Sequence, residues 1–315
     1  MCIHLLSTIN GGYEVPFRVT VQSYLDQCVG AEAVWHVFIS DLPESSRNAI
    51  EDQAAGHPLE FRWYDFEGLL PADLPVRGHF VPHVYARILA PRLLPAEVQR
   101  FLYLDGDLLL LDDISDLWGA DLQGAVIGAV TDMAVPHVSS PMGLRRFREL
   151  GFQPQDPYFN AGVYLADTKA WRARETGRLA LEYLDRYRDD VNLLDQDALN
   201  AVLRDLWKPL DLRWNLISGL AGRPFFNAGE FEEEEYRSAL AKPGIVHFAG
   251  LLKPWVHPRI ASRWNTQYLQ TLDRVFPDHK LSRSLSSRSF SFYDRRLRRI
   301  FYPAEKYVWS KRRGF

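Results

Sequence analysis

Cysteine is scarce in this sequence, since Cys2 and Cys28 are the only two among 315 residues. They show no metal-ligand spacing and are too few for a disulfide framework. The sequence also lacks Asn-X-Ser/Thr sequons, and residues 1–10 lack the basic segment and long apolar run of a signal peptide. No apolar stretch approaches the roughly 20 residues that a membrane helix needs. These absences predict a cytoplasmic location.

The overall composition indicates a folded protein with an uneven charge distribution. Hydrophobic residues make up 47% and charged residues 24% of the chain, as in ordinary soluble globular proteins. The length suffices for one large or two modest domains. The net charge is −3, yet residues 280–315 carry eleven Lys and Arg against two Asp and Glu. One end of the chain is therefore strongly basic, and the remainder is acidic.

Hydrophobic periodicity predicts strands that alternate with helices. The expected strands are Ile3–Thr8, Val34–Ser40, Leu59–Tyr64, Arg100–Leu104, Val126–Thr131, Gly162–Leu165 and Ile245–Phe248. The expected helices are Phe17–Cys28, which follows Pro16 as a start signal, Glu44–Ala55, Val84–Leu94 and Asp195–Leu206. This alternation with short links is typical of an α/β fold with a mostly parallel central sheet flanked by helices.

One acidic segment carries the strongest chemical signal. A strand of buried type, Arg100–Leu104, leads into Asp105-Gly106-Asp107. Side chains alternate along an extended backbone, so both Asp side chains point to one side, and Gly106 lets another group approach closely. Two convergent carboxylates repel each other unless a cation lies between them. The motif predicts a divalent-metal site at the carboxyl end of a strand, although a solvated acidic turn has the same sequence.

Four further segments combine polar residues with strand or helix patterns. They are His83-Val-Tyr-Ala-Arg87, Tyr158-Phe-Asn-Ala-Gly-Val-Tyr-Leu-Ala-Asp167, Leu194-Asp-Gln-Asp-Ala-Leu-Asn200 and Val246-His-Phe-Ala-Gly-Leu-Leu-Lys-Pro-Trp255. Taken singly, each polar residue has an ordinary structural explanation. His247 suits a core, Asn160 a turn, Asp195 a helix N-cap and Lys253 the surface.

As an ordered set, these segments and the acidic motif resemble the retaining glycosyltransferases of family 8. That family includes bacterial lipopolysaccharide galactosyl- and glucosyltransferases, with glycogenin and galactinol synthase as relatives. The resemblance covers about residues 1–275 and implies a GT-A type nucleotide-diphospho-sugar transferase fold, with a catalytic domain over residues 1–277. It implies a retaining, metal-dependent hexosyltransferase that moves galactose or glucose from a UDP-sugar to a glycan or glycolipid such as lipopolysaccharide.

The resemblance also implies roles at the diphosphate. Asp105, Asp107 and His247 match the ligands of Mn²⁺, with Mg²⁺ as the alternative, and two carboxylates plus an imidazole suit that ion. The metal would neutralise charge on the departing nucleoside diphosphate. Lys253 matches a diphosphate contact and acts as a point charge, and Gly250 allows the backbone to approach the phosphates.

Other matching residues are implied to bind the donor sugar and to carry the reaction. These are His79, Arg87, Asp132 and Asn160 for the donor, and Asp195 and Gln196 nearest the reacting carbon. Retention by double displacement needs a nucleophile opposite the leaving group, and Gln196, which matches that position, is a poor one. We therefore favour front-face attack, in which the leaving diphosphate takes the acceptor proton and Gln196 stabilises an oxocarbenium-like centre.

The first predicted strand departs from the family pattern. The family's Asp-Asp-Asn-Tyr, which contacts the nucleotide, is replaced by Ser7-Thr-Ile-Asn-Gly-Gly-Tyr-Glu14, and the acidic pair is missing. Thr8, Asn10 and Tyr13 remain as candidates for binding the base, Tyr13 by stacking. Uridine specificity is thus less well supported than diphosphate binding.

The basic end of the chain, residues 278–315, predicts a membrane-surface helix. Apolar residues from Phe290 to Val308 recur at three- and four-residue spacing among arginines and lysines, with a kink expected at Pro303. Each basic residue contributes about 1 kcal/mol near an anionic membrane. We expect peripheral attachment to the cytoplasmic face of the inner membrane, with packing on the catalytic domain as the alternative. Nucleic-acid binding is not expected, since no recognition module is present.

Several other hypotheses about the function stay open at this point. A glycogenin-like initiator that glucosylates itself, a non-catalytic nucleotide-sugar-binding protein and a metal-dependent phosphohydrolase are the alternatives. The last would need a water-activating base and a second-metal cluster, and the sequence offers neither clearly. Acceptor identity is expected to be determined by the loops Pro136–Asp156 and Leu216–Phe231, which carry no portable motif.

Overall fold

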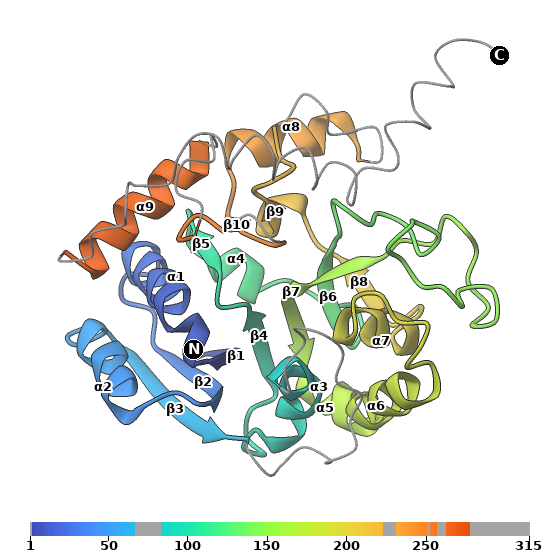
Figure 1. Cartoon of the computed structure of the whole chain (residues 1–315), viewed down its shortest axis with the longest axis horizontal. Helices are drawn as coiled ribbons and strands as arrows, with labels where there is room; N and C mark the ends of the chain where they lie inside the picture. Colours follow the sequence, from blue (N-terminus) through green and yellow to red (C-terminus); the bar gives the residue numbers. More distant parts are fainter. Residues whose placement is uncertain (1, 67–82, 223–230, 251–252, 257–262, 278–315) are drawn as a thin grey trace. The chain divides into compact units, whose positions relative to one another are not determined.

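The computed structural model describes residues 2–66, 83–222, 231–250, 253–256 and 263–277 (Figure 1). The chain divides into two compact units, Met1–Phe276 and Pro277–Phe315. The predicted basic tail, residues 278–315, lies outside the described residues, so the proposed domain assignment stays a prediction. Among the described residues, no helix has the length and apolar character needed to cross a bilayer.

A seven-stranded sheet in the order β3-β2-β1-β4-β7-β6-β8 forms the centre of the first unit. Its strands are β1 (Ile3–Asn10), β2 (Ala33–Ser40), β3 (Leu59–Asp65), β4 (Arg100–Leu104), β6 (Ile127–Thr131), β7 (Phe159–Asp167) and β8 (Trp207–Pro209). The pairs β1–β2, β2–β3, β1–β4 and β6–β8 are parallel. Strand β7 runs antiparallel to both β4 and β6. The mostly parallel α/β fold is confirmed, with β7 as the reversed strand.

A small second sheet, in the order β5-β10-β9, lies next to the carboxyl end of β4. It consists of β5 (Leu108–Leu110), β10 (Ile245–His247) and β9 (Leu216–Ile217). Strand β5 begins one residue after Asp107 and pairs antiparallel with β10, so that His247 lies opposite Leu108. This register brings His247 next to the segment Asp105-Gly106-Asp107.

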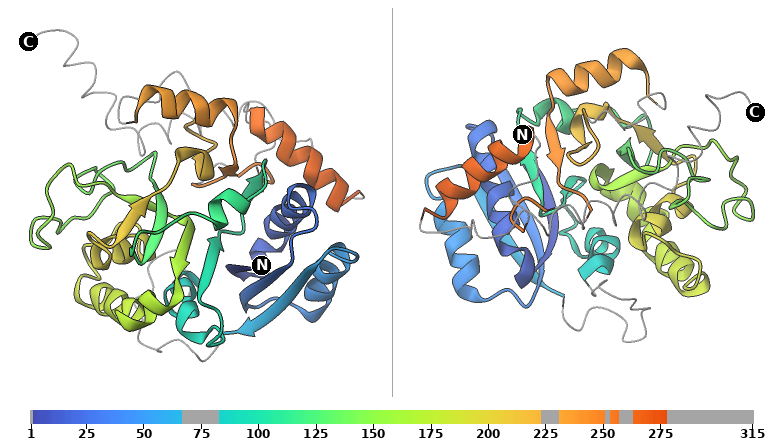
Figure 2. Two further views of the ribbon diagram at one scale, coloured as in Figure 1. Left: turned by 180° about the vertical axis from the view of Figure 1, so that it is seen from behind. Right: turned by 45° about the horizontal axis from the view of Figure 1, so that its top comes forward.

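Helices cover both faces of the large sheet (Figures 1 and 2). On one face, α1 (Glu14–Gln27) packs Phe17 and Tyr24 edge-on against Trp35, at centroid distances of 5.2 and 5.5 Å. The helices α2 (Glu44–Gln53) and α9 (Arg263–Val275) both contact α1. Four helices cover the other face: α3 (His83–Leu93), α5 (Thr168–Ala173), α6 (Thr176–Arg186) and α7 (Asp195–Val202). They pack on an aromatic core that includes Phe101, Tyr103 and Tyr164. The sheet is therefore buried on both sides, as its apolar strands require.

Most predicted elements are confirmed, and the bounds of three of them differ by three or more residues. Helix α1 begins at Glu14 rather than Phe17, because Pro16 is tolerated in a first helical turn. Helix α7 ends at Val202 rather than Leu206, and Asp205 adopts a left-handed conformation before β8. Strand β7 is longer than predicted. Further elements are η1 (Gly11–Tyr13), α4 (Ser115–Trp118), η2 (Leu212–Trp214) and α8 (Glu233–Ala241), whose first turn carries Glu233, Glu234 and Glu235.

Candidate active site

Three candidate metal ligands meet at the connection between the two sheets. Asp105 and Asp107 lie between β4 and β5, and His247 is the last residue of β10. The His247 Nε2 atom lies 3.7 Å from Asp105 Oδ2 and 3.3 Å from Asp107 Oδ1. One ligand atom from each residue lies within 4.8 Å of the others. The predicted convergence of the two carboxylates is confirmed, and a solvated acidic turn is excluded because Asp107 is buried.

Glycines near this connection have different roles. A Cβ atom at Gly106 would lie 3.2 Å from Ile9 Cγ2 and 3.3 Å from Tyr13 Cδ1, so the close approach expected here is made by neighbouring side chains. Gly250 has a φ of +85°, a left-handed conformation that favours glycine. No described atom lies within 4 Å of a Cβ built at Gly250.

Arg87 on α3 joins the two acidic parts of the site. Its Nη2 donates to Asp105 Oδ1 at 2.7 Å and its Nη1 to the Ala161 carbonyl at 2.9 Å. Its Nε lies 2.8 Å from Asp195 Oδ2, within ion-pair distance but not aligned for a hydrogen bond. The guanidinium also lies over the Tyr103 ring, 4.7 Å from its centroid. One largely buried cation therefore holds two carboxylates together.

Lys253 neutralises the other candidate ligand. Its Nζ donates to Asp107 and, at 2.8 Å, to the Phe248 carbonyl. Burial disfavours the ionised form of Asp107, but the Lys253 ammonium and His247 outweigh it and hold the pKa of Asp107 well below its usual range. The alternative of an ordinary surface lysine is excluded, because the side chain of Lys253 is only 17% exposed.

Asp132, Asn160 and Gln196 form a second polar group. Asp132 Oδ2 accepts the amide nitrogens of Asn160 at 2.8 Å and of Gln196 at 3.0 Å. Its Oδ1 accepts the backbone N–H groups of Ala134 and Val135. Asn160 lies within β7, so the alternative of a turn residue is wrong. These side chains are oriented before any ligand binds.

Asp195 is the first residue of α7 and is buried. The N-cap is Leu194, so the N-cap explanation for Asp195 is wrong. Burial raises the pKa of Asp195 to about 6, although the Arg87 guanidinium acts in the opposite direction. Its neighbour Gln196 accepts the Ala161 N–H through Oε1 at 2.9 Å. The paired positions predicted nearest the reacting carbon thus lie beside Arg87 and Asp132.

The altered loop after β1 reaches the same region. The Thr8 hydroxyl lies 3.0 Å from the Tyr103 hydroxyl, which donates to Asp105 at 3.0 Å. Asn10 ends β1, and Tyr13 makes an edge contact with Trp255 at 6.3 Å. Burial and the Asp107 carboxylate raise the pKa of Tyr13 to about 12. His79 lies outside the described residues, so its predicted position is not tested.

Sequence reasoning missed several polar residues of this region. Tyr103 precedes Asp105 by two residues, so strand alternation would have directed both side chains to one face. The Tyr158 hydroxyl donates to the buried Asp197 at 2.5 Å, beneath α7. Asn215, which contacts both His247 and Asn160, follows η2 in a segment without a recognisable motif. Only the first of these had a usable sequence signal.

The donor set of the acidic connection fits a divalent cation. Two carboxylates and one imidazole face one point, and such oxygen and nitrogen ligands can hold a divalent metal ion. Arg87 pairs with Asp105 and Lys253 pairs with Asp107, so each carboxylate has a cationic partner. The site is thus built around negative charge that requires cationic partners.

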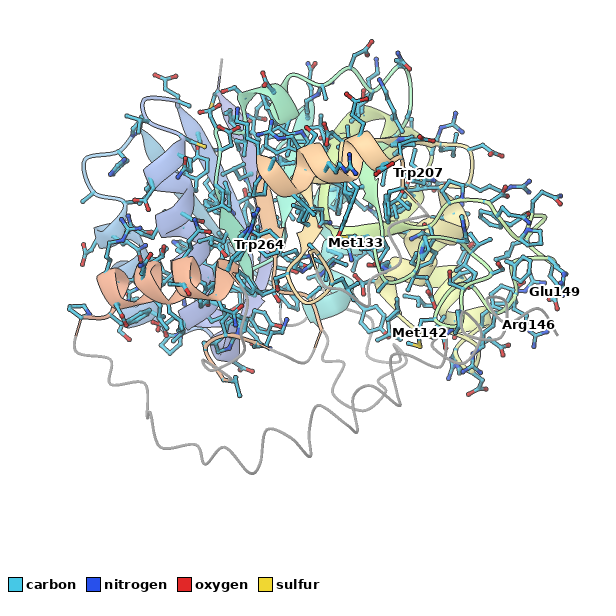
Figure 3. The ribbon with its side chains drawn as sticks, turned by 90° about the horizontal axis from the view of Figure 1, so that it is seen from above. Met133, Met142, Arg146, Glu149, Trp207 and Trp264 are labelled. Atoms are coloured by element: carbon cyan, nitrogen blue, oxygen red, sulfur yellow. The ribbon has the colours of Figure 1, made fainter. Side chains whose placement is uncertain are left out.

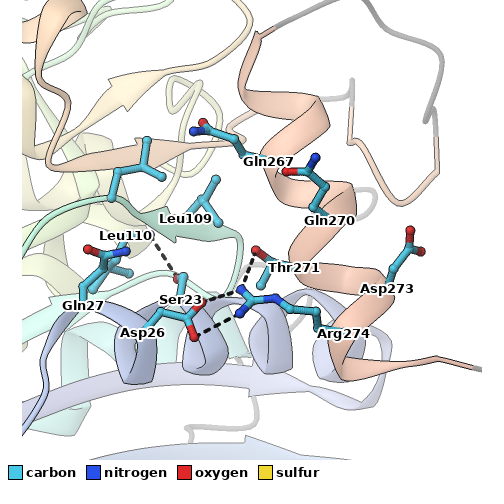
Figure 4. Close-up of a pocket in the computed structure, with 11 residues that line it drawn as sticks. Ser23, Asp26, Gln27, Leu109, Leu110, Gln267, Gln270, Thr271, Asp273 and Arg274 are labelled. Atoms are coloured by element: carbon cyan, nitrogen blue, oxygen red, sulfur yellow. Dashed lines mark hydrogen bonds and ion pairs between the residues drawn. The ribbon is translucent and has the colours of Figure 1, made fainter.

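A separate pocket of about 510 Å³ lies between α1, β5 and α9 (Figure 4). Its polar lining includes Gln27, Gln267 and Gln270, and an ion pair joins Arg274 to Asp26 across it. None of its lining residues belongs to the predicted donor or metal set. The pocket is therefore not part of the candidate active site.

Comparison with known proteins identifies related sequences. Residues 4–259 match the family described as Glycosyl transferase family 8. General stress protein A of Bacillus subtilis (strain 168) is 31% identical over 226 residues, which cover 67% of this chain and 76% of that protein. Lipopolysaccharide 1,2-glucosyltransferase of Escherichia coli (strain K12) is 28% identical over 55% of this chain and 48% of its own length. Probable galacturonosyltransferase-like 4 of Arabidopsis thaliana is 27% identical over 83% and 75% of the two chains.

Solved structures share the fold. The WbbM bifunctional glycosyltransferase matches with a TM-score of 0.74 at 20% identity, over 86% of this chain and 49% of that chain. The galactosyltransferase LgtC, solved with donor and acceptor sugar analogues, matches with a TM-score of 0.70 at 24% identity, over 86% and 96% of the two chains. The architecture is therefore that of the GT-A glycosyltransferases. Since the family match spans most of the sequence, the chain belongs to glycosyltransferase family 8.

Proposed function

We propose that the protein is a retaining hexosyltransferase that moves galactose or glucose from a UDP-sugar to a glycan or glycolipid acceptor. The observation that carries the proposal is the convergence of Asp105, Asp107 and His247, flanked by the buried cations Arg87 and Lys253. The family relatives named as a lipopolysaccharide glucosyltransferase and a galactosyltransferase support hexose transfer and a lipopolysaccharide-type acceptor.

In this proposal Asp105, Asp107 and His247 hold Mn²⁺, or Mg²⁺ in its place. The bound cation supplies electrostatic stabilisation of the negative charge that develops on the departing diphosphate. Lys253 supplies a second positive charge for the same diphosphate, and the left-handed backbone at Gly250 allows phosphate oxygens to approach. Thr8, Asn10 and Tyr13 are proposed to contact the nucleoside.

The donor sugar is proposed to bind between the metal site and α7. Arg87, Asp132 and Asn160 offer donors and acceptors for its hydroxyl groups, with His79 as a further candidate. Asp132 and Asn160 are held by backbone N–H groups, so their orientation costs little entropy when the sugar binds. Pre-oriented groups of this kind favour one sugar geometry.

Front-face transfer agrees best with the environment of Gln196. Its Oε1 already accepts the Ala161 N–H and its Nε2 donates to Asp132, so the amide is held rather than free to attack. The acceptor oxygen forms its bond to the anomeric carbon as the bond to the diphosphate oxygen breaks. The acceptor proton passes to that phosphate oxygen. Gln196 and Asp195, the latter paired with Arg87, stabilise the positive charge at the sugar.

The acceptor is proposed to contact the connection between β6 and β7. Met142, Arg146 and Glu149 lie in this loop, with Arg146 and Glu149 at one end of the view in Figure 3. The side chain of Met142 is exposed, and Arg146 pairs with Glu149 at 2.8 Å. A loop with exposed apolar and charged groups beside the donor residue Asp132 suits a bulky, partly charged acceptor.

Attachment to the cytoplasmic face of an anionic inner membrane completes the proposal. It is based on the charge of residues 280–315, where eleven basic residues accompany two acidic ones. Such a segment would bring the enzyme to a lipid-linked acceptor.

The first experiment measures nucleoside diphosphate release from a panel of nucleotide sugars in the presence of Mn²⁺. UDP-galactose, UDP-glucose and UDP-galacturonate belong in the panel, with Asp107→Asn as the control. Slow hydrolysis of one UDP-hexose that is lost in the variant is expected. Absence of release from every donor, together with absence of Mn²⁺-dependent UDP binding, would overturn the proposal. Transfer of radiolabel to the protein itself would indicate a self-glucosylating initiator instead.

A further inference from the structure

A continuous row of side-chain hydrogen bonds runs from the metal site to the predicted reaction centre. The Nδ1 of His247 lies 3.0 Å from Asn215 Oδ1, and Asn215 Nδ2 donates to Asn160 Oδ1 at 2.9 Å. Asn160 Nδ2 donates to Asp132 Oδ2 at 2.8 Å, and that oxygen also accepts from Gln196 at 3.0 Å. All but Gln196 are buried, with Asn215 only 1% exposed.

Backbone groups of β7 fix the direction of each bond. The Gly162 N–H donates to Asn160 Oδ1 at 2.9 Å, so this oxygen is an acceptor and Asn215 must turn its NH₂ group towards it. Asn215 Oδ1 then faces His247, and an amide oxygen can only accept. The Nδ1 atom of His247 therefore carries a proton, and Nε2, which faces the two carboxylates, is the nitrogen left available to a metal ion.

The other end of the row is fixed in the same way. The Ala161 N–H donates to Gln196 Oε1 at 2.9 Å, so Gln196 turns its NH₂ group towards Asp132. The second carboxylate oxygen of Asp132 accepts from Ala134 and Val135 at 2.7 and 3.1 Å. The N–H groups of two successive residues of β7, Ala161 and Gly162, thus orient the side chains of the row.

We infer that Asn215 is a positioning residue that holds His247 in the metal-binding tautomer and couples the metal site to Gln196 through Asn160 and Asp132. The inference rests on the proposed function. Outer partners of a metal-binding histidine set its tautomer and ring orientation, and their loss costs about 10- to 100-fold in metal affinity or activity. Asn215 is the only described residue whose side chain contacts both His247 and Asn160 in this row.

Two substitutions separate the contact of Asn215 with His247 from its contact with Asn160. Asn215→Leu removes both bonds, and Asn215→Asp keeps an acceptor for His247 but cannot donate to Asn160. Mn²⁺ affinity is measured on the full chain from the paramagnetic resonance signal of free Mn²⁺, and turnover is measured as donor hydrolysis at saturating Mn²⁺. Asn200→Ala serves as the matched control, because Asn200 is equally buried but bonds to Phe159 and the Gln196 carbonyl.

The expected results differ between the variants. Asn215→Leu should weaken Mn²⁺ binding about 10- to 100-fold, while Asn215→Asp should stay within a few-fold of the wild type and lose turnover. Asn200→Ala should bind Mn²⁺ as the wild type does. Wild-type Mn²⁺ affinity in a folded Asn215→Leu variant would overturn the inference, as would equal losses of affinity in the Leu and Asp variants. A wild-type chain that binds no Mn²⁺ would overturn the proposed metal site and this inference together.

Discussion

Gly162 on β7 lies directly against the imidazole of His247. A Cβ atom added at Gly162 would lie 2.3 Å from His247 Cε1 and 2.8 Å from Asp105 Oδ2. The Gly162 carbonyl also accepts the Asp105 N–H at 2.8 Å. Asp105 and His247 therefore pack directly on the backbone of Gly162, and any side chain at position 162 must displace one of them.

Gly162→Ala is expected to weaken Mn²⁺ binding by at least about 10-fold and to destabilise the fold by about 1–3 kcal/mol through overpacking. Isothermal titration with Mn²⁺ and thermal unfolding measure the two effects. Gly219→Ala is the matched control, because no atom of the described residues lies within 4 Å of a Cβ at that glycine. Equal Mn²⁺ affinities for the two variants would contradict the assignment of Asp105 and His247 as ligands.

Arg87→Ala is expected to lower the free energy of unfolding by about 3–5 kcal/mol, because it leaves two largely buried carboxylates without their shared cation. Arg87 contacts Asp105 and Asp195 at 2.7 and 2.8 Å, and all three side chains are less than one-fifth exposed. Urea unfolding measures the loss. Arg178→Ala, which removes an exposed arginine with two carboxylate partners, should leave the stability unchanged. A similar loss in both variants would mean that burial does not govern the effect.

The sequence was sufficient to predict the convergence of Asp105 and Asp107, because both the preceding strand and the side-chain alternation are local properties. It did not predict the small sheet. The predicted strand Ile245–Phe248 is confirmed as β10, but its partners β5 and β9, of three and two residues, carry no periodicity and were not predicted. The pairing of β10 with β5 determines where His247 lies. The reversed direction of β7 was missed for a similar reason, because apolar periodicity is the same in either direction.

The hydrogen-bonded partners of the site were even less accessible to sequence reasoning. Asn215 lies 55 residues from Asn160 and 32 from His247 in the chain, so no local spacing relates them. Tyr158 and Asp197 are 39 residues apart, although each lies in a segment that was singled out. Contacts of this kind depend on how helices dock on the sheet, which only the structure reveals.

Removal of the basic tail is expected to abolish membrane binding and to preserve catalysis. A chain that ends at His279 should release diphosphate from the donor but should no longer sediment with anionic vesicles, whereas the full chain should sediment and dissociate as salt increases. Neutral vesicles and a full-length variant with serine at Arg295, Arg296, Arg298 and Arg299 are the controls. Sedimentation of the shortened chain equal to that of the full chain would contradict the membrane role.

His36 is expected to make the protein less stable in mild acid. Burial and the neighbouring His4 lower the pKa of His36 to about 4, against an ordinary value of 6.5. Between these values the unfolded chain binds more protons than the folded chain. The contribution of His36 is therefore fully present above pH 6.5 and is lost as the pH falls through 4. It amounts to at most about 3 kcal/mol.

His36→Gln removes this titration and keeps a polar side chain next to Tyr64. The difference in free energy of unfolding between wild type and variant should shrink from pH 7.5 to pH 4.5, as measured by urea unfolding. Asp195 and Asp197, whose pKa values burial raises to about 6, act in the opposite direction but are common to both proteins. A difference that does not change with pH would contradict the assignment.

Lys253→Met is expected to separate metal binding from diphosphate binding. In the described structure the Lys253 ammonium donates to Asp107, so a divalent cation must compete with it for that carboxylate. Loss of the ammonium should leave Mn²⁺ affinity unchanged or tighten it. UDP binding in the presence of Mn²⁺ should weaken by about 10- to 100-fold, as expected for a lost hydrogen bond to a charged group.

The same substitution leaves Asp107 buried without its cation, so the metal-free variant should unfold at a lower temperature than the wild type. Saturating Mn²⁺ should then raise the melting temperature of Lys253→Met more than that of the wild type, because the metal replaces the missing positive charge. Lys169→Met, at an exposed position of α5, controls for the loss of a lysine. Weaker binding of Mn²⁺ alone by Lys253→Met would instead mean that Lys253 shapes the metal site, and that it does not compete for Asp107.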